Sequence, residues 1–496
     1  MTVAIDWRAE ASRLTIRDKA FIGGAFMDAA NGATFDCISP VDGAVLARVA
    51  ACDAQDVDRA VKAARDAFED GRWADRSPKA RKRTLIKFAE LIEKHGDEIA
   101  LLETLDMGKP IANARGGDVR AVTECVRWYG EAIDKLYDEI APTPKTALAL
   151  ITREPIGVVG AVVPWNFPLL MAAWKFAPAL AAGNSVVLKP AEQSPLTALR
   201  VAELAAEAGI PPGVFNVVPG FGETAGQALG RHMDVDALTF TGSTEVGKFF
   251  LKYSAESNMK TVSLECGGKT PNIVFADTPD LKAAAKGAAD GIFYNSGQVC
   301  DAASRLLIED KIHDAFLSEV AALAKQYRPG DPLDEKTKMG AIVDATQTHR
   351  VLGFIDMGKT EGATLTLGGN QVRTETGGFY IEPTIFDRVN NSMTIAREEI
   401  FGPVLSAITF KTPEEAVKLA NDSKYGLEAN LWTNDLTKAH KIARALRAGT
   451  VTVNTRDGGG IEVPFGGYKQ SGFGRDKSLH ALHKYTQLKT TYIQIG

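Results

Sequence analysis

The chain has 496 residues, of which 45% are hydrophobic and 24% are charged, and its formal net charge is −5. This length predicts two to four domains with large cores, and the ordinary composition is typical of a soluble globular protein. The acidic balance disfavours nucleic acids and anionic membrane surfaces as partners.

The N-terminal stretch carries the acids Asp6 and Glu10 and lacks the apolar core of a secretory signal. The most apolar long run, 167–183, is interrupted by Lys175 and Pro178 and is short for a membrane span. We therefore expect a cytoplasmic protein. Its five cysteines include no CxxC pair, and its seven histidines include no HExxH motif, so neither a disulfide framework nor a metal site is expected.

The first third of the chain reads as helical. Apolar residues recur at helical spacing across 54–70. Ser77 followed by Pro78 predicts the start of a further helix, and the basic run 81–83 on that helix is interpreted as a solvated face.

From about residue 150 the pattern changes to short β-branched runs that alternate with helical stretches. Buried strands are predicted within 157–164, 184–190, 213–220, 237–243 and 271–277. Strands that alternate with helices predict a parallel sheet with helices on both faces, so the fold class is α/β. A second α/β run follows from 302 to 459, and the Thr- and Tyr-rich segment 484–495 reads as a terminal strand.

A strand, a glycine turn and a helix are predicted across 238–250, with Ser243 as the N-cap. The backbone amides at such a helix start favour an anion, usually a phosphate. The sequence GSTEVGK resembles the start of a P-loop. However, Phe249 stands where a P-loop requires the Ser or Thr that binds magnesium, which argues against a nucleoside triphosphatase. A phosphate site and a plain tight turn both remain open.

Two other motifs follow predicted strand ends, where open α/β sheets bind ligands. Lys189 and Glu192 either hold ribose and phosphate oxygens or form a solvated charged pair. Asn166 stands between two prolines and either caps a turn or offers its amide to a substrate oxygen.

Glu265 and Cys300 are the two candidates for reaction chemistry. Glu265 lies in an apolar run, where a carboxylate is costly unless it is paired or protonated, so it is either a general base or a salt-bridged structural acid. Cys300, in FYNSGQVCDAASR, is either an inert core thiol or a nucleophile. His313, the nearest histidine, lies thirteen residues further on and does not support a Cys-His dyad.

Over nearly its whole length the chain resembles the NAD(P)-dependent aldehyde dehydrogenase superfamily. The resemblance rests on motifs in the order of that family: PWNFPLL, LKPAEQSP, FTGSTEVG, LECGGKTPNIV, FYNSGQVC, EEIFGPVL and PFGGYKQSGFGRD. A bacterial subgroup that acts on γ-glutamyl-γ-aminobutyraldehyde and other ω-amino aldehydes is similar at AFIGGAF, RWYGEAIDKLYDEIA, GIFYNSGQVC and GRDKSLHALHKYTQLKT, which implies a role in polyamine catabolism.

The resemblance implies a thioester mechanism. Cys300 would attack the aldehyde carbon to form a thiohemiacetal, with Asn166 and the N–H of Cys300 as oxyanion donors. Hydride transfer to NAD would leave a thioester, which water activated by Glu265 would hydrolyse. Relatives that depend on CoA typically lack this acid, so its presence favours a free carboxylic acid as product. Lys175 matches a family lysine at the active site.

The resemblance also implies a site for NAD. Lys189 and Glu192 match the residues that hold the adenine ribose, and a carboxylate there repels a 2′-phosphate, so NAD is expected in preference to NADP. The other matching cofactor residues are Trp165 along the cleft, Gly242 and Ser243 at the pyrophosphate, Glu399 at the nicotinamide ribose and Phe401 near the ring.

The implied fold has two Rossmann-like α/β domains with parallel sheets and a small β arm. We expect an NAD-binding domain over 1–136 and 156–265, a catalytic domain over 266–477, and an oligomerisation arm over 137–155 and 478–496. Because free strand edges pair readily, the arm predicts a homodimer or a homotetramer.

Departures from the family bear on the substrate. Asp301 follows the nucleophile where relatives commonly carry a small or apolar residue, and loop 454–467 offers Arg456 and Asp457 where many have aromatic residues. We expect a polar ω-amino, γ-glutamylamino or guanidino aldehyde whose charge meets Asp301 or Asp457. In the alternative, Asp301 pairs with Arg456 or another base and never meets substrate. The remaining expected substrate residues are Phe167, Trp174 and Phe465.

Other functions stay open at this point: a broad-specificity aliphatic or aryl aldehyde dehydrogenase, a thioesterase or esterase that acts through Cys300, a CoA-acylating enzyme, and a catalytically silent scaffold. Formation of NADH from NAD and an aldehyde separates the dehydrogenases from the hydrolases and the scaffold.

Overall fold

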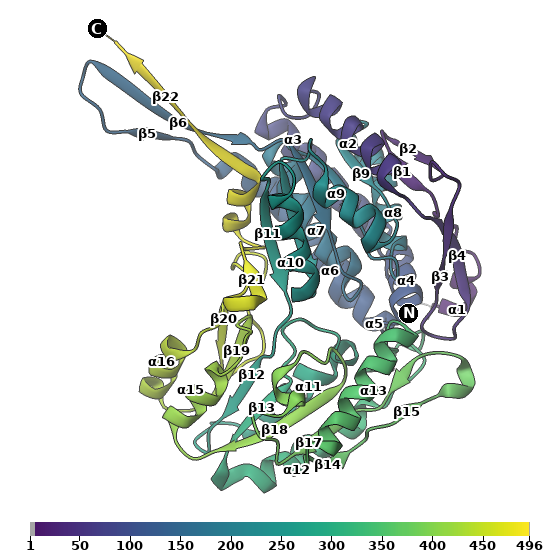
Figure 1. Cartoon of the computed structure of the whole chain (residues 1–496), viewed down its shortest axis with the longest axis vertical. Coiled ribbons are helices and arrows are strands. Elements are labelled where there is room, and N and C mark those ends of the chain that lie inside the picture. Colours follow the sequence, from purple (N-terminus) through teal and green to yellow (C-terminus); the bar gives the residue numbers. More distant parts are fainter. Residues whose placement is uncertain (1–4, 496) are drawn as a thin grey trace.

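The computed structural model describes residues 5–495. Figure 1 shows two α/β bodies, one above the other, and a narrow β arm that projects from the upper body. No helix in this described part of the chain is long and apolar enough to cross a membrane.

The first body is built on a mixed sheet with parallel central strands. Across the sheet, its strands among the described residues are β2 (Ala25–Met27), β1 (Ala20–Ile22), β9 (Phe215–Val217), β8 (Ser185–Lys189), β7 (Val158–Val162), β10 (Ala237–Gly242), β11 (Thr261–Cys266) and β21 (Gly472–Phe473). The strands from β9 to β11 are parallel, whereas β1 and β21 pair antiparallel at the two sides. The α/β prediction is therefore confirmed.

Helices cover both faces of this sheet. One face carries α7 (Pro168–Ala182) and α8 (Leu196–Ala208), backed by α3 (Pro78–Lys94), α4 (Gly96–Met107) and α6 (Arg120–Ala132). The other face carries α2 (Ala54–Glu69), α9 (Gln227–Arg231) and α10 (Thr244–Ala255). The predicted cap of α3 is confirmed, because the Ser77 hydroxyl accepts a hydrogen bond from the N–H of Ala80 at 3.3 Å. The short helices α1 (Trp7–Ala11) and α5 (Ile111–Asn113) complete this body.

The second body repeats the architecture. Its sheet runs β14 (Thr364–Leu367), β17 (Thr384–Asp387), β18 (Val404–Phe410), β13 (Arg305–Glu309), β12 (Pro271–Val274), β19 (Glu428–Trp432) and β20 (Thr450–Val453), and within the described range β14 is the antiparallel member. One face packs on α11 (Leu281–Phe293) and α12 (His313–Ala324), and the other on α13 (Ala345–Thr360), α14 (Thr394–Arg397), α15 (Pro413–Asn421) and α16 (Leu436–Ala445). A small ladder, β15 (Gln371–Val372) with β16 (Tyr380–Ile381), lies beside it.

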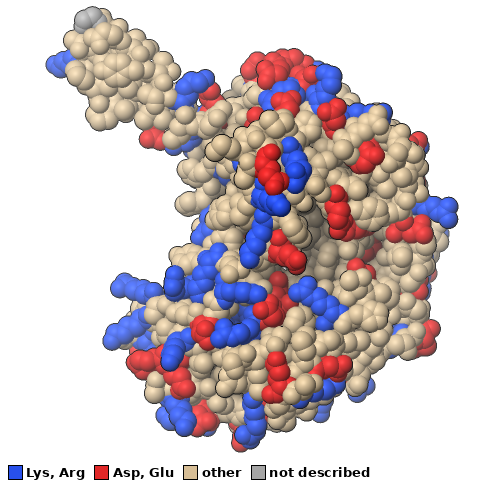
Figure 2. Space-filling model, viewed as in Figure 1, with Lys and Arg blue, Asp and Glu red and all other residues tan. Residues whose placement is uncertain are grey.

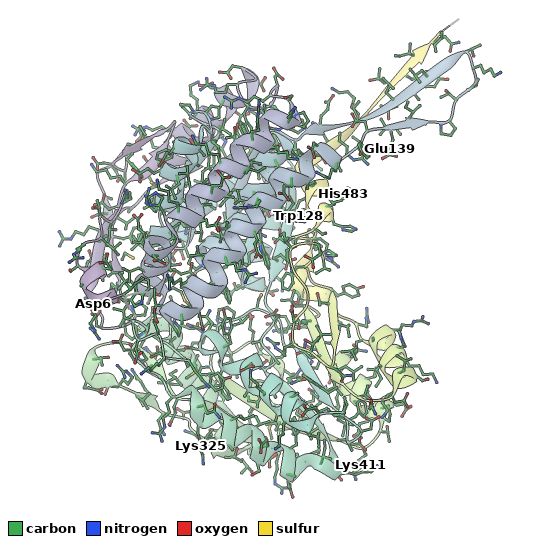
Figure 3. All side chains as sticks on the ribbon, turned by 180° about the vertical axis from the view of Figure 1, so that it is seen from behind. Asp6, Trp128, Glu139, Lys325, Lys411 and His483 are labelled. Carbon is green, nitrogen blue, oxygen red and sulfur yellow. The ribbon has the colours of Figure 1, made fainter. Side chains whose placement is uncertain are left out.

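The arm consists of β5 (Glu139–Ala141), β6 (Ala147–Pro155) and β22 (Thr486–Gln494). The predicted terminal strand β22 pairs antiparallel with β6 over its whole length. Figure 3 shows the arm from behind, extending away from the body beyond Glu139, with His483 near its base. The expected domain boundaries remain a prediction, although the strands between 137 and 155 do join β22 in a separate sheet.

The helical reading of the first third was wrong for residues 20–50. This segment forms β1 and β2 and a second hairpin, β3 (Thr34–Ile38) with β4 (Val45–Ala50). Burial alternates strictly along β3, so a period of two was present in the sequence. The strands are only three to six residues long, and this is too short for the pattern to stand out.

The solvated-face reading of the basic run was also wrong at Arg81. Its side chain is buried, and its guanidinium donates hydrogen bonds to the carbonyl oxygens of Ala181 and Ala74, each at 3.0 Å. Arg81 thus satisfies a carbonyl in the last turn of α7 that the helix itself leaves without a partner.

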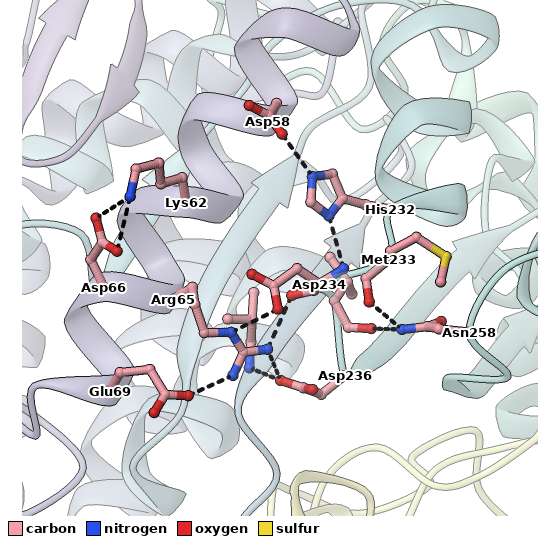
Figure 4. A network of polar contacts seen from close by, with 12 residues as sticks. Asp58, Lys62, Arg65, Asp66, Glu69, His232, Met233, Asp234, Asp236 and Asn258 are labelled. Carbon is pink, nitrogen blue, oxygen red and sulfur yellow. Dashed lines mark hydrogen bonds and ion pairs between the residues drawn. The ribbon is translucent and has the colours of Figure 1, made fainter.

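A polar network joins α2 to the starting edge of the first sheet (Figure 4). Arg65 on α2 donates to the carboxylates of Asp236 at 2.6 Å and Asp234 at 3.0 Å. Asp236 also accepts from the N–H of Val158, the first residue of β7, at 2.7 Å. The central strands of the sheet are parallel, so their amino ends lie at one edge and their carboxyl ends at the other. This network fixes the edge with the amino ends, and the candidate site lies at the edge with the carboxyl ends.

Candidate active site

A cavity of about 320 Å³ lies between the two bodies. The first body contributes the carboxyl ends of β7, β8, β10 and β11, which is the edge where open α/β sheets bind ligands. The second body contributes Cys300 and residues from α13 and the segment before β18. Figure 2 shows the surface hollowed between the two bodies, with charged side chains along the hollow.

Most of the residues singled out in the sequence line this cavity. They are Trp165, Asn166, Trp174, Lys189, Glu192, Gly242, Ser243, Glu265, Cys300, Glu399, Phe401 and Phe465. Four others do not line it: Phe167, Lys175, Asp301 and Asp457. Sequence reasoning missed several lining residues, among them Met171, Glu223, Cys266, Gln347 and Arg350.

The loop that carries Cys300 has an unusual backbone. Asn295, Ser296 and Gly297 have φ values of 49°, 57° and 72°, so three successive residues adopt the left-handed conformation. A side chain at Gly297 would collide with the carbonyl oxygen of Gly402. Such strained backbone persists where the surroundings impose it, and it clusters at functional sites.

Asn166 joins its own loop to the loop of Cys300. Its side-chain amide donates to the carbonyl oxygen of Gln298 at 2.9 Å, and its own carbonyl accepts from the amide of Asn295 at 3.0 Å. Asn166 is buried. These two bonds fix an amide donor next to the cavity wall that contains Cys300.

The thiol of Cys300 is surrounded by acids. Burial raises its pKa well above the ordinary value, and the charges of Asp301 and Glu265 raise that pKa further. The resting group is therefore a thiol, and its conversion to the nucleophilic thiolate needs a change in its surroundings.

Glu265 lies near the end of β11 and is only 5% exposed. Among the described residues its Oε1 atom finds no hydrogen-bond partner. Burial raises the pKa of this carboxyl well above its usual range, and the negative charge of Asp476 adds to the effect. A carboxyl group with a raised pKa in a cavity is a candidate general base.

Lys175 lies beneath the cavity on α7, fully buried in an ion pair with Asp476. Lys484 makes a second ion pair with the same carboxylate. Burial works to raise the pKa of Asp476, but the charges of Lys175 and Lys484 outweigh it and lower that pKa. Sequence reasoning missed Asp476 and Lys484, and no local pattern marks either residue.

The other half of the cavity has the features of a nucleotide site. Lys189 and Glu192 form an ion pair at 3.0 Å after β8. The Ser243 hydroxyl accepts from the N–H of Val246 at 3.2 Å, which confirms the predicted cap of α10. The start of this helix faces the cavity, and its backbone amides favour an anion.

Glu399 rests on a pair of glycines. Its carboxylate accepts from the N–H of Gly268 at 3.2 Å, and a side chain at Gly267 would collide with it. Burial raises the pKa of Glu399 to about 7. The glycine pair thus lets a carboxylate approach the backbone closely enough to reach the cavity.

Phe401 is held in a left-handed conformation, with φ of 59°. Its ring packs edge-on against Trp165 with 5.1 Å between the centroids. The missed residue Gln347 supports this arrangement, because its amide donates to the carbonyl oxygens of Ile400 and Phe401 at 3.1 and 2.8 Å. The positive φ, invisible in the sequence, is what directs these carbonyls toward α13.

The remaining predicted substrate residues lie behind or beyond the cavity wall. Phe167 stacks on Tyr294 with centroids 6.2 Å apart. Asp457 is exposed, and its carboxylate accepts from the N–H of Gly459 at 2.9 Å. Asp301 is partly exposed, and Arg456 donates to its main-chain carbonyl at 3.3 Å, not to its carboxylate. Burial raises the pKa of the neighbouring Glu428, which sequence reasoning missed, and the charge of Asp301 raises that pKa further.

The model of the aldehyde dehydrogenase family matches residues 26–491. The NADP/NAD-dependent aldehyde dehydrogenase PuuC of Escherichia coli (strain K12) is 53% identical over 489 residues, which cover 99% of this chain and 98% of that protein.

Two solved structures are similar over 99% of both chains, each with a TM-score of 0.98. One is P. syringae AldA indole-3-acetaldehyde dehydrogenase in complex with NAD⁺ and IAA, at 60% identity. The other is γ-glutamyl-γ-aminobutyraldehyde dehydrogenase from Burkholderia cenocepacia J2315, at 58% identity.

Proposed function

Because the chain belongs to the aldehyde dehydrogenase family, we propose that it oxidises a polar ω-amino, γ-glutamylamino or guanidino aldehyde to the carboxylic acid with NAD⁺. The observation that carries the proposal is the convergence of a thiol, a buried carboxyl and a fixed amide, those of Cys300, Glu265 and Asn166, on one cavity.

In the proposed reaction, the Cys300 thiol releases its proton to solvent, and its sulfur attacks the aldehyde carbon. The amide of Asn166 and the N–H of Cys300 donate to the oxyanion of the thiohemiacetal, and donors fixed in advance contribute strongly to such steps. NAD⁺ held by Glu192, Glu399 and the start of α10 would supply the hydride acceptor, and loss of the hydride would leave the acyl group on Cys300 as a thioester.

Glu265 is the proposed base for the second half of the reaction. Its carboxylate takes a proton from the water that attacks the thioester, which releases the carboxylic acid and the Cys300 thiol. The raised pKa of Glu265 makes its carboxylate more basic than an exposed one. The same acid argues against transfer of the acyl group to CoA.

The residues of the other half of the cavity fit NAD⁺. Two carboxylates, those of Glu192 and Glu399, suit ribose hydroxyls, and the amides at the start of α10 suit the pyrophosphate. Glu192 disfavours a 2′-phosphate, so NAD⁺ is the proposed cofactor in preference to NADP⁺. The volume of about 320 Å³ lies within the usual range for cofactor pockets.

We infer the domain roles from the same geometry. The sheet from β1 to β11 supports an NAD-binding domain of 1–136 and 156–265, and the segment that carries Cys300 supports a catalytic domain of 266–477. The arm of 137–155 and 478–496 exposes apolar side chains, including Tyr137 at 77% and Leu488 at 64%. Such a surface supports assembly into a homodimer or homotetramer, which size-exclusion chromatography with light scattering tests.

Asp301 is the proposed partner of the substrate's positive charge. Its side chain is partly exposed beside Cys300, and Arg456 donates to the main-chain carbonyl of Asp301 and not to its carboxylate. Replacing Asp301 by Asn should raise KM for 3-aminopropanal far more than for the isosteric butanal. Equal changes for both aldehydes would contradict this role.

A second candidate function, oxidation of aryl aldehydes, is favoured by the tilted pair of Trp174 and Phe465 in the cavity wall, whose centroids are 5.3 Å apart. A panel of amino, guanidino, aliphatic and aryl aldehydes with NAD⁺, followed at 340 nm, decides between the candidates. The Cys300→Ala variant should form no NADH with any of them. NADH formation by that variant at the native rate would overturn the mechanism.

A further inference from the structure

A buried lysine that the proposed chemistry does not use lies behind the active-site loops. Lys109, which follows α4, is 1% exposed. Its ammonium makes ion pairs with Glu103 at 2.7 Å and with Asp118. Asp118 belongs to a π-helical turn, 114–119, and such turns frequently mark functional sites.

The same ammonium lies over an aromatic ring. The Nζ atom of Lys109 is 3.9 Å from the centroid of Phe167, a cation–π distance. Phe167 stacks on Tyr294 at 6.2 Å with 27° between the ring planes. Lys109, Phe167 and Tyr294 thus form a continuous stack, and Tyr294 is its partly exposed member.

This stack flanks the place where the two active-site loops are joined. Phe167 follows Asn166, and Tyr294 precedes Asn295. The amide of Asn295 donates to the carbonyl of Asn166 at 3.0 Å, and the amide of Asn166 donates to the carbonyl of Gln298. The separation of the two rings therefore sets the separation of the candidate oxyanion donor from the loop of Cys300.

Stability alone does not account for a buried lysine at this position. Burial works to lower the pKa of Lys109, but the charges of Asp118 and Glu103 outweigh it and raise that pKa, so the ammonium stays charged. Burial raises the pKa of Glu103, and the charge of Lys109 opposes that rise. Buried ion pairs are often no more stabilising than apolar side chains of the same size.

We propose that Lys109 is a positioning residue, which holds Phe167 against Tyr294 and so fixes the distance between the Asn166 loop and the Cys300 loop. The inference rests on the proposed aldehyde dehydrogenase function. Lys109 acts through the two rings and touches neither aldehyde nor cofactor.

The test compares two variants of the full-length chain. Lys109→Met leaves Asp118 buried without a partner and should lower stability. Lys109→Met combined with Asp118→Asn removes one charge of each sign, so its thermal midpoint should return toward that of the native chain. We expect kcat per reactive thiol to remain about tenfold low in this double variant, with the reactive Cys300 counted by labelled iodoacetamide.

Two aldehydes and one control sharpen the readout. KM for phenylacetaldehyde should change more than KM for butanal, because a larger substrate is more sensitive to the spacing of the two loops, and KM for NAD⁺ should change less than twofold. The matched control is Lys260→Met. Lys260 is also buried, but it bonds to Gly230 and Ser257, away from the cavity, and its loss should leave kcat unchanged.

Recovery of native kcat together with stability in the double variant would overturn the proposal, because Lys109 would then serve stability only. Phe167→Leu gives an independent measurement, since it removes the ring and keeps both ion pairs; native kcat and native aldehyde selectivity in this variant would also overturn it. Failure of the proposed function itself differs, because the native chain would then form no NADH with any aldehyde.

Discussion

Glu265 lines the cavity and Asp476 is buried behind it in the ion pair with Lys175, yet the pKa values of the two carboxyl groups are displaced in opposite directions. One oxygen of Glu265 has no partner within residues 5–495, and burial keeps the pKa of Glu265 high. Asp476 is buried as deeply but lies between Lys175 and Lys484, which lower its pKa. The difference teaches that burial alone does not decide ionisation: the partner decides whether a buried acid becomes a base for catalysis or a fixed charge.

The largest expected effect is the fall in kcat when Glu265 is replaced. Glu265→Gln keeps the shape of the side chain and removes its basicity, so hydrolysis of the thioester should slow and kcat should fall about 10³-fold, within the range for loss of a general base. Steady-state NADH formation measures this. A kcat within threefold of the native value would remove Glu265 from the mechanism.

Replacement of Asp476, the acid paired with two lysines, should mainly lower the free energy of unfolding. Asp476→Asn leaves two buried lysines without a counter-charge and should cost about 3–5 kcal/mol of unfolding free energy, measured by urea denaturation. Because the lysines lower the pKa of Asp476 below its ordinary 3.8, its contribution is complete above that pH and is lost as pH falls through the lowered pKa.

A control separates this loss from a packing defect. Adding Lys484→Met to Asp476→Asn removes one of the two stranded charges and should recover part of the lost stability. If the double variant is less stable than Asp476→Asn alone, the ion pairs do not account for the effect.

The link between the two acids predicts a shift in pH dependence. The charge of Lys175 lowers the pKa of Glu265, so Lys175→Met should raise that pKa and move the acid limb of the pH–kcat profile to higher pH. Glu265 acts as a base only when ionised, so kcat falls as pH falls through its pKa. Lys175→Arg keeps the charge and should leave the limb within a few tenths of a unit. A shift to lower pH in Lys175→Met would contradict the electrostatic coupling.

The smallest expected effect is a change in cofactor preference when Glu192, a partly exposed acid, is replaced. The Glu192 side chain is 31% exposed and is paired with Lys189. In Glu192→Gln the repulsion of a 2′-phosphate is lost, and kcat/KM for NADP⁺ relative to NAD⁺ should rise about fivefold, because solvent screens the charge. An unchanged ratio of the two kcat/KM values would mean that another residue selects the cofactor.

The sequence predicted the elements that carry local patterns. The five buried strands lie inside the predicted ranges, and the caps at Ser77 and Ser243 form as expected. The β1–β4 hairpins were missed because strands of three to six residues give too few positions for a period to appear. Arg81 was misread because its burial depends on α7, about 100 residues further along the chain.

The residues of the candidate site also fall into two groups, those that could be predicted from local sequence patterns and those that could not. Residues at strand ends, such as Lys189 and Glu265, could be singled out because the ends of parallel strands meet at one edge of a sheet. Asp476 and Lys175 are 301 residues apart, so their ion pair has no local signature. The position of Gln347 depends on the positive φ of Phe401, which arises from tertiary packing and cannot be seen in the residue types.

The central claim is that Cys300 carries the acyl group and that Glu265 releases it. The most direct measurement is mass spectrometry of the Glu265→Gln variant after one turnover with NAD⁺ and 3-aminopropanal. The account predicts one NADH per active site and one acyl group on the peptide that contains Cys300, with no acyl group on Cys266 or another cysteine. NADH without an adduct on Cys300, or an adduct on another residue, would contradict it.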